Sequence, residues 1–238
     1  MGLTEDIRGV AGVALTALDD AHDYYTHTKR AWGLIREVVR EGRKFTFVNS
    51  QTKTRMDQRA ILARSRLYVQ ENLASATFQS FVSIFEDFSF DILRLWLAAY
   101  PGSLSKKQLE FGTVLNAPNI ATVVLAVVDR ELNEVKYERV ADWFAYLERL
   151  AKLGVPASEH IERLAEIKAA RDILVHNKGI VNATYLHKAG KLARFAIGQR
   201  LDIDLPYHLA SWESIKKLVS DLSTAMIRKV EIAPGDGK

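Results

Sequence analysis

The sequence predicts an all-α protein whose helices pack together as a multi-helix bundle. Only 5 prolines and 13 glycines occur among the 238 residues, so few positions can interrupt a helix. One long apolar segment, Ala74 to Tyr100, repeats its large side chains at helical spacing. Hydrophobic residues make up 48% of the chain, which at this length is enough to bury a core without disulfides.

The N-terminal part of the chain is expected to contain three helices and one loop. Thr4 can cap the first helix, because a threonine oxygen accepts hydrogen bonds from the free N–H groups at a helix start. Gly42 can end that helix, because glycine readily adopts the left-handed backbone of a helix end. The expected elements are a helix from Thr4 to about Arg40, a loop from Lys44 to Thr54, a helix from Met56 to Glu71 and a helix from Ala74 to Tyr100.

The segment from Ala74 to Tyr100 is expected to be the central core helix. At about 100° per residue, seven large apolar side chains fall on one arc, and four charged side chains fall outside it or on its edge. Pro101 and Gly102 then end the helix. The apolar set is Phe78, Phe81, Val82, Phe85, Phe88, Ile92 and Trp96, and the charged set is Glu86, Asp87, Asp91 and Arg94.

The C-terminal half is expected to add more helices and a small irregular or hairpin insertion before the last one. The insertion is indicated by Leu201, Ile203 and Leu205, which alternate with aspartates at the period of a strand. We predict one domain over residues 1–232 and a frayed tail at 233–238. The expected helices are Ser105–Leu115, Asn119–Glu131, Lys136–Leu153, Ser158–His176 and about Ser211–Val230.

Composition narrows the classes of function. The chain has no cysteine, which excludes disulfides, thiolate metal sites and cysteine nucleophiles. This absence suits a reducing cytoplasm, where we expect the protein to reside. The net charge of +4 and the pI near 9.2 permit an anionic partner such as RNA. No apolar run approaches the ~18 residues of a membrane span, so no membrane association is expected.

No metal or cofactor is expected either. His22 and His27 lie beside three aspartates in the first helix, but their spacing of five is not the i, i+4 spacing of paired helical ligands. A solvated helix face is the expected role of this group. The sequence also contains no phosphate-binding glycine loop and no nucleophile elbow.

Arg171 is the most unusual residue of the helix that begins at Ser158. It falls in the middle of the apolar arc of that helix. A guanidinium cannot lose its charge, and burying it unpaired is costly. It therefore needs a partner, which can be a carboxylate, a second subunit or a bound phosphate. The carboxylates of the core helix that can pair with Arg171 are Glu86, Asp87 and Asp91.

His176 is expected in the last turn of the same helix. Asn177, Lys178 and Gly179 follow it and form a suitable C-cap. The negative end of the helix dipole favours a protonated imidazole there. Asp172 lies four residues earlier on the same face, where it can orient the ring.

At these positions the sequence Arg171-Asp172-Ile-Leu-Val-His176-Asn177 resembles the HEPN superfamily (higher eukaryote and prokaryote nucleotide-binding domains), whose signature is Arg-x4-His. The flanking residues resemble the larger prokaryotic HEPN nucleases, and the resemblance covers about residues 55–228. The flanking features are Phe85-Glu86-Asp87 before the motif and Asn182, Tyr185, Leu186 and Gly198 after it.

The resemblance implies a homodimer in which two motifs face each other and cleave RNA without a metal, by attack of the 2′-hydroxyl on its own phosphate. It implies that His176 is the general acid or base and that Arg171 binds the scissile phosphate. Asp172 and Asn177 are implied as supporting residues. It also implies a role in defence or in a toxin system with an antitoxin protein. The additional candidate cleft residues are Glu86, Lys178, Asn182 and Tyr185.

Two alternatives remain open at the level of sequence. The chain can be a non-catalytic HEPN module that binds nucleotide, RNA or a protein partner through the same cleft. It can also be a helical scaffold in which the motif is a coincidence. Lys178 occupies the position where toxins controlled by a nucleotidyltransferase carry tyrosine, which argues against that kind of partner. The basic residues that can form a track for RNA are Arg163, Lys168, Lys178, Lys188, Lys191, Arg194 and Arg200.

Overall fold

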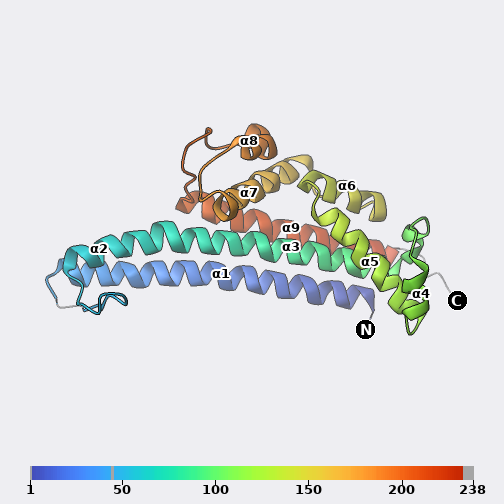
Figure 1. Ribbon diagram of the computed structural model, residues 1–238, viewed down its shortest axis with the longest axis horizontal. Coiled ribbons are helices and arrows are strands. Elements are labelled where there is room, and N and C mark those ends of the chain that lie inside the picture. The colour runs from blue at the N-terminus through green and yellow to red at the C-terminus, as the bar shows by residue number, and fades with distance from the viewer. Residues whose placement is uncertain (1, 44–45, 233–238) are drawn as a thin grey trace.

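The computed structural model describes residues 2–43 and 46–232, and it confirms the predicted all-α bundle. Two long antiparallel rods form its base (Figure 1). The first rod is α1 (Leu3–Arg40), and the second is α2 (Gln58–Arg66) continued into α3 (Ala74–Ala99). α9 (Leu205–Ile232) packs along α1 and α3.

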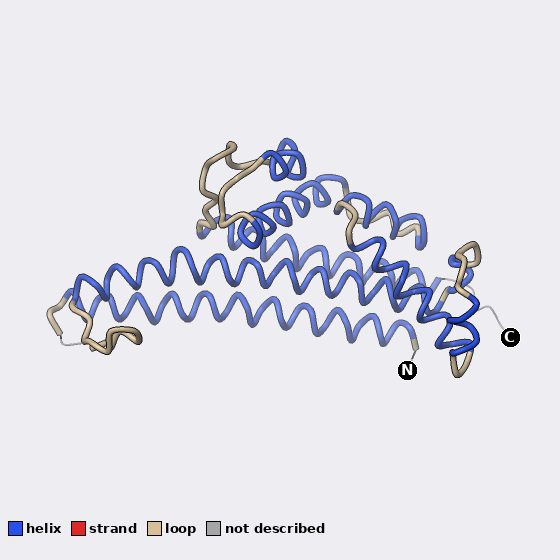
Figure 2. The backbone as a smooth tube through the Cα atoms, in the orientation of Figure 1, coloured by secondary structure: helices blue, strands red, loops and turns tan. Residues whose placement is uncertain are grey.

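α6, α7 and α8 lie on one side of this base, while α5 runs down to α4 at the end of the rods where α1 begins (Figure 1). α7 packs against α3, α6, α8 and α9, so its motif is held over the central helix. Figure 2 shows that the described chain consists of helices and loops, without strands. The bounds of these helices are α4 (Phe111–Asn116), α5 (Ile120–Lys136), α6 (Val140–Ala151), α7 (Ser158–His176) and α8 (Ala183–Ala189).

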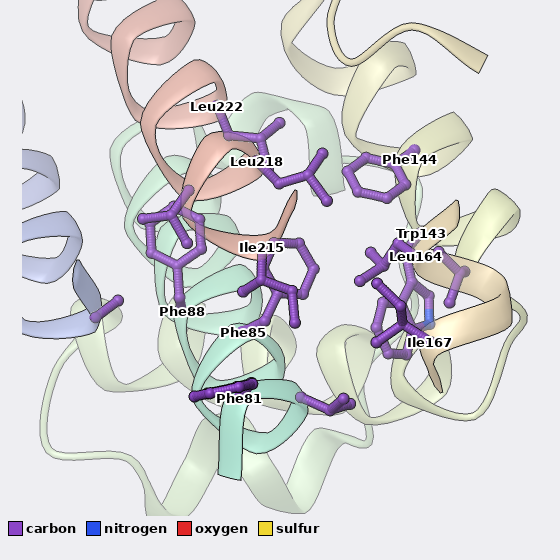
Figure 3. Packing of buried hydrophobic residues seen from close by; sticks show 14 of the residues in the cluster. Phe81, Phe85, Phe88, Trp143, Phe144, Leu164, Ile167, Ile215, Leu218 and Leu222 are labelled. Atoms are coloured by element: carbon purple, nitrogen blue, oxygen red, sulfur yellow. The ribbon is translucent and has the colours of Figure 1, made fainter. Parts of the chain in front are cut away.

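The core forms where α3, α9, α6 and α7 meet. Figure 3 shows Phe81 and Phe85 of α3 facing Ile215 of α9 and, across the core, Ile167 of α7. The predicted apolar arc of the central helix is confirmed, because all seven of its side chains are buried. Burial of large aromatic side chains stabilises a fold by about 1.5–3 kcal/mol each relative to their exposure. This core therefore fixes the position of α7.

The second rod is continuous where two separate helices were predicted. The helices expected at Met56–Glu71 and Ala74–Tyr100 form one continuous rod, joined by a π-helical stretch at Leu67–Leu73. Neither proline nor glycine occurs between 56 and 99, so nothing in the backbone forces a break. Thr4 is not the cap of α1, because that helix begins at Leu3 and its N-cap, Gly2, has no side chain to contribute.

The segment before the last helix is irregular rather than a hairpin. Leu201 and Ile203 are buried while Asp202 is exposed, but Leu205, the third apolar residue of the predicted alternation, is exposed. In the described chain this segment instead pairs with residues 179–181, through backbone hydrogen bonds and an isolated bridge between Ile180 and Arg200. α9 begins at Leu205 rather than Ser211, because the Oδ1 of Asp204 accepts a hydrogen bond from the N–H of Tyr207 at 2.8 Å.

Apart from the helix Ser158–His176, the other predicted helices differ in their bounds. The helix expected at Ser105–Leu115 is limited to α4, and the helix α8 was not predicted. None of the described helices is both long enough and apolar enough to cross a membrane. The tail predicted at 233–238 lies outside the described residues, as do Lys44 and Phe45 of the predicted loop.

Candidate functional site

The motif occupies the C-terminal end of α7. This helix begins at Ser158 and ends at His176, as predicted. Lys178 and Gly179 then adopt positive φ angles of 53° and 77°, and the N–H of Gly179 donates to the carbonyl of Ile173 at 3.0 Å. The side chain of Asn177 donates to the carbonyl of Ile180. The chain therefore turns sharply immediately after His176.

Arg171 has the carboxylate partner that its position requires. Its Nη2 lies 3.2 Å from the Oε2 of Glu86, and its Nη1 lies 3.2 Å from the Oδ1 of Asp172. Lys168 shares the same carboxylate, with its Nζ 2.8 Å from the Oε1 of Glu86. All four side chains are at most 20% exposed, so these ion pairs are partly shielded from water. The Nε of Arg171 is buried without a described hydrogen-bond partner.

Asp172 lies at the centre of this ion cluster. Its Oδ2 accepts a hydrogen bond from the Nζ of Lys188 at 3.0 Å. Burial alone would raise the pKa of Asp172, but Lys168, Lys188 and Arg171 together lower it. Asp172 is therefore a carboxylate held by three cations, and none of its described hydrogen bonds or ion pairs reaches His176. The predicted orienting bond from Asp172 to the imidazole is absent from the described contacts.

His176 is exposed and lines a small pocket at the end of α7. The pocket has a volume of about 190 Å³. It brings together five of the predicted site residues, namely Asp172, His176, Asn177, Asn182 and Tyr185. Arg171 does not line it, since a spacing of five turns the two side chains about 140° apart on a helix. Lys178 lines a different and larger groove.

Asn182 and Tyr185 have structural partners in this pocket. The Oδ1 of Asn182 accepts a hydrogen bond from the N–H of Tyr185 at 3.0 Å and caps α8. The hydroxyl of Tyr185 donates to the Oε1 of Glu166 at 2.9 Å and accepts from the N–H of Arg194 at 3.0 Å. Burial raises the pKa of Tyr185 to about 12, so this phenol remains protonated at neutral pH.

Glu166 is a buried residue that the sequence did not single out. It is 3% exposed and accepts a second hydrogen bond from the hydroxyl of Tyr207 at 2.7 Å. Burial raises its pKa even though both tyrosine hydroxyls and nearby arginines act in the opposite direction. Through Glu166, α7 is connected to both α8 and α9. This network fixes the walls of the pocket rather than supplying a reactive group to it.

Asn182→Ala is expected to lower the free energy of unfolding by about 1 kcal/mol, because it removes the N-cap of α8. Asn182→Asp should retain most of the stability, since an aspartate oxygen can accept the same bond. Urea denaturation of the three proteins measures both effects. A variant with unchanged stability but impaired activity would instead assign Asn182 to the chemistry of the pocket.

Most basic residues of the predicted RNA track are paired with carboxylates. Lys191 pairs with Glu162 at 2.9 Å, and Arg194 with Asp204 at 3.7 Å. Lys168 and Lys188 belong to the cluster around Asp172. Arg163 and Lys178 take part in none of the described ion pairs. The neighbourhood of the motif therefore has little uncompensated positive charge of its own.

His22 is not on a solvated helix face as predicted. Its ring stacks on Trp212 with centroids 4.2 Å apart, and it lies 6.0 Å from the ring of His208. Among the residues that the structure describes, no group of three or more histidine, aspartate or glutamate side chains is placed to hold a metal ion.

Comparison with known proteins found no matching family model, no matching curated protein and no matching solved structure.

Proposed function

We propose that this protein is an endoribonuclease of the HEPN type that acts as a homodimer and needs no metal. The observation that carries the proposal is the position of His176, which is exposed at the end of α7 and shares a pocket with Asp172 and Asn177. A general acid or base must be reachable by its substrate, and this histidine is. The resemblance of the motif to HEPN nucleases supports the same assignment.

In the proposed reaction, His176 removes the proton from a ribose 2′-hydroxyl. The 2′-oxygen then attacks the adjacent phosphorus, and the bond from phosphorus to the 5′-oxygen breaks. The departing 5′-oxygen takes a proton, which the histidine of the second protomer can supply. The products are a 2′,3′-cyclic phosphate and a 5′-hydroxyl. Arg171 stabilises the charge that grows on the phosphate oxygens.

The second protomer is required for a physical reason. Arg171 and His176 of one chain project in different directions, and both Nη groups of Arg171 contact carboxylates. A facing copy of the motif would supply the missing acid and a second arginine. A cellular role in defence, or as a toxin controlled by an antitoxin protein, belongs to this proposal and rests on the family resemblance alone.

The alternative is a non-catalytic HEPN module that uses the same cleft to bind nucleotide, RNA or a protein partner. The pairing of Arg171 with Glu86 favours this alternative. The guanidinium of Arg171 already contacts two carboxylates. A phosphate would have to displace one of these carboxylates or share the guanidinium with them. Such a module would keep the dimer and the fold but would not cleave RNA.

The proposal is tested by incubating the purified protein with mixed RNA in EDTA and identifying the new ends. Size-exclusion chromatography with light scattering gives the oligomeric state of the same sample. A dimer that produces 2′,3′-cyclic phosphate and 5′-hydroxyl ends is expected. A monomer would contradict the composite site. A verified dimer that leaves every RNA intact would support the binding module instead.

A further inference from the structure

The charge of this protein is concentrated in one segment. Residues 29–66 contain 11 lysines and arginines but only 3 acidic residues, an excess of 8 positive charges. The whole chain has a net charge of +4, so the other 200 residues carry a net charge of −4. An excess of one sign over one part of a surface is the electrostatic footprint of a polyanion-binding protein.

The described basic residues of this segment gather at one end of the molecule. Residues 29–66 include the end of α1, the connecting loop and α2, and this end of the two rods projects beyond the other helices (Figure 1). We call residues 29–43 and 46–66 the basic tip. Eight of its cations are exposed, and they are Arg30, Arg40, Arg43, Lys53, Arg55, Arg59, Arg64 and Arg66.

The cations of the basic tip are largely uncompensated. Among the described ion pairs only one involves the tip, between Arg43 and Glu41. This contrasts with the motif, where Lys168, Arg171 and Lys188 all contact carboxylates. An unpaired cation can bind a phosphate without first losing a protein partner. The basic tip is therefore the stronger attractor for an anionic polymer.

Aromatic packing gives the tip a defined surface. The ring of Trp32 lies 5.4 Å from that of Phe47 and 5.6 Å from that of Tyr68, so the connecting loop is anchored on the two rods. The Nη1 of Arg64 donates to the hydroxyl of Tyr68 at 2.9 Å. Arginines held on an ordered surface lose less entropy when they bind a phosphate.

A groove connects the tip to the end of α7. It has a volume of about 1010 Å³ and lies where the π-helical stretch faces the segment before α9. Lys29 and Arg66 of the tip line it, and so does Lys178, two residues after His176. Polar Gln70 and Asn72 of the π-helical stretch also line it. The remaining charged lining is mixed and consists of the ion pair Arg200–Glu71 and the carboxylates Asp202 and Asp204. A flexible polymer bound at the tip can follow this groove towards the motif.

We propose that the basic tip and this groove bind the phosphate backbone of single-stranded RNA. Eight of the ten cations of the basic tip are arginines, whose planar guanidinium groups bind phosphate oxygens in pairs. The groove adds amide side chains that can contact bases. A membrane surface would use the cations but not the polar groove. The inference deepens the proposed function, because it locates substrate binding, yet it depends on binding and not on cleavage.

The test measures binding of a fluorescein-labelled RNA oligonucleotide of mixed sequence to the full chain carrying His176→Ala, at several salt concentrations. Four tip arginines are changed to glutamine, as Arg55→Gln, Arg59→Gln, Arg64→Gln and Arg66→Gln. The control quartet makes the same change in net charge at exposed cations away from the tip. It consists of Lys106→Gln, Lys136→Gln, Arg228→Gln and Lys229→Gln.

The tip quartet is expected to weaken RNA binding by about tenfold or more. It should also reduce the slope of log K against log salt by about 3, since each phosphate contact to a single strand contributes about 0.7. The control quartet should change both quantities far less. Circular dichroism checks that each variant is folded. The double variants Arg55→Gln/Arg59→Gln and Arg64→Gln/Arg66→Gln should each show part of the loss in RNA affinity.

Equal losses in the two quartets would overturn the inference, because the effect would then reflect net charge alone. Binding to phosphatidylserine vesicles in the absence of RNA binding would overturn it too and would assign the tip to a membrane surface. RNA binding that depends on the tip, in a parent protein that cleaves nothing, would uphold the inference and reject the nuclease. RNA cleavage by the parent, together with RNA binding that does not depend on the tip, would uphold the nuclease and reject the inference.

Discussion

Replacing His176 with alanine is expected to reduce RNA cleavage by about 10²–10⁴-fold, the usual contribution of a general acid or base. Stability should be unchanged, because the imidazole is exposed and makes none of the described hydrogen bonds or ion pairs. Its removal therefore leaves no buried group without a partner. Single-turnover cleavage rates, measured together with thermal unfolding and the oligomeric state, separate the chemical effect from a folding effect.

The matched control for this variant is His187→Ala. His187 is also an exposed histidine, and it lies nearby on α8 but lines a different pocket. The two substitutions remove the same group from similar surroundings, so only His176→Ala should affect cleavage. If the His176→Ala protein cleaves RNA as fast as its parent, the proposed mechanism is wrong.

Arg171→Ala would be a less direct test. It should also inactivate the protein, but it removes a guanidinium from a cluster in which Glu86 and Asp172 both depend on it. Glu86 would keep Lys168 as a partner at 2.8 Å, so the remaining carboxylates are not left entirely unpaired. A loss of activity in Arg171→Ala can therefore come from reduced stability as well as from the lost chemical group. In His176→Ala it comes from the lost chemical group alone.

The helices were predictable to the extent that local sequence determines them. The apolar arc of α3 and the end of α7 at His176 follow from helical spacing and from the glycine after the motif. α8 was not predicted because it has only seven residues, too few to show a helical period. The early start of α9 differs from the prediction because Asp204, which fits the alternating pattern of a strand, caps the helix instead.

The candidate site was predictable in its residues but not in its contacts. The position of Arg171 on an apolar arc required a partner, and packing of α7 on α3 selected Glu86 from three nearby carboxylates. The spacing of five residues on α7 keeps Arg171 out of the pocket of His176. Glu166 and its two tyrosines lie on three different helices, so no local pattern indicated that they meet. Such contacts depend on tertiary packing, which no local period encodes.

A fall in pH from about 6.5 to 4 is expected to remove about 3 kcal/mol of stability through one buried histidine, His208. Its side chain lies between α1, α3 and α9 and is fully buried. The hydroxyl of Thr77 donates to the carbonyl of Leu73 at 2.8 Å, so its oxygen is free to accept from the Nε2–H of His208 at 2.7 Å. The Nδ1 of His208 has no described partner.

The sign of this effect follows from the neutral form of the ring. Burial, with smaller contributions from His22 and Lys29, lowers the pKa of His208 from 6.5 to about 4. Between these values the unfolded chain binds a proton that the folded chain does not. Stability is therefore fully present above about pH 6.5 and is lost as the pH falls towards 4. At pH 5 the loss should already be about 2 kcal/mol.

His208→Leu is expected to remove most of this pH dependence. At pH 7 the change should cost only about 1 kcal/mol, because Thr77 keeps its bond to Leu73 and the new side chain is apolar. Burial also lowers the pKa of His22, so a small dependence should remain. His27→Gln, at an exposed histidine on α1, should behave like the parent. Urea unfolding at pH 7 and pH 5 measures the difference, and equal losses in the parent and His208→Leu would show that His208 is not the titrating group.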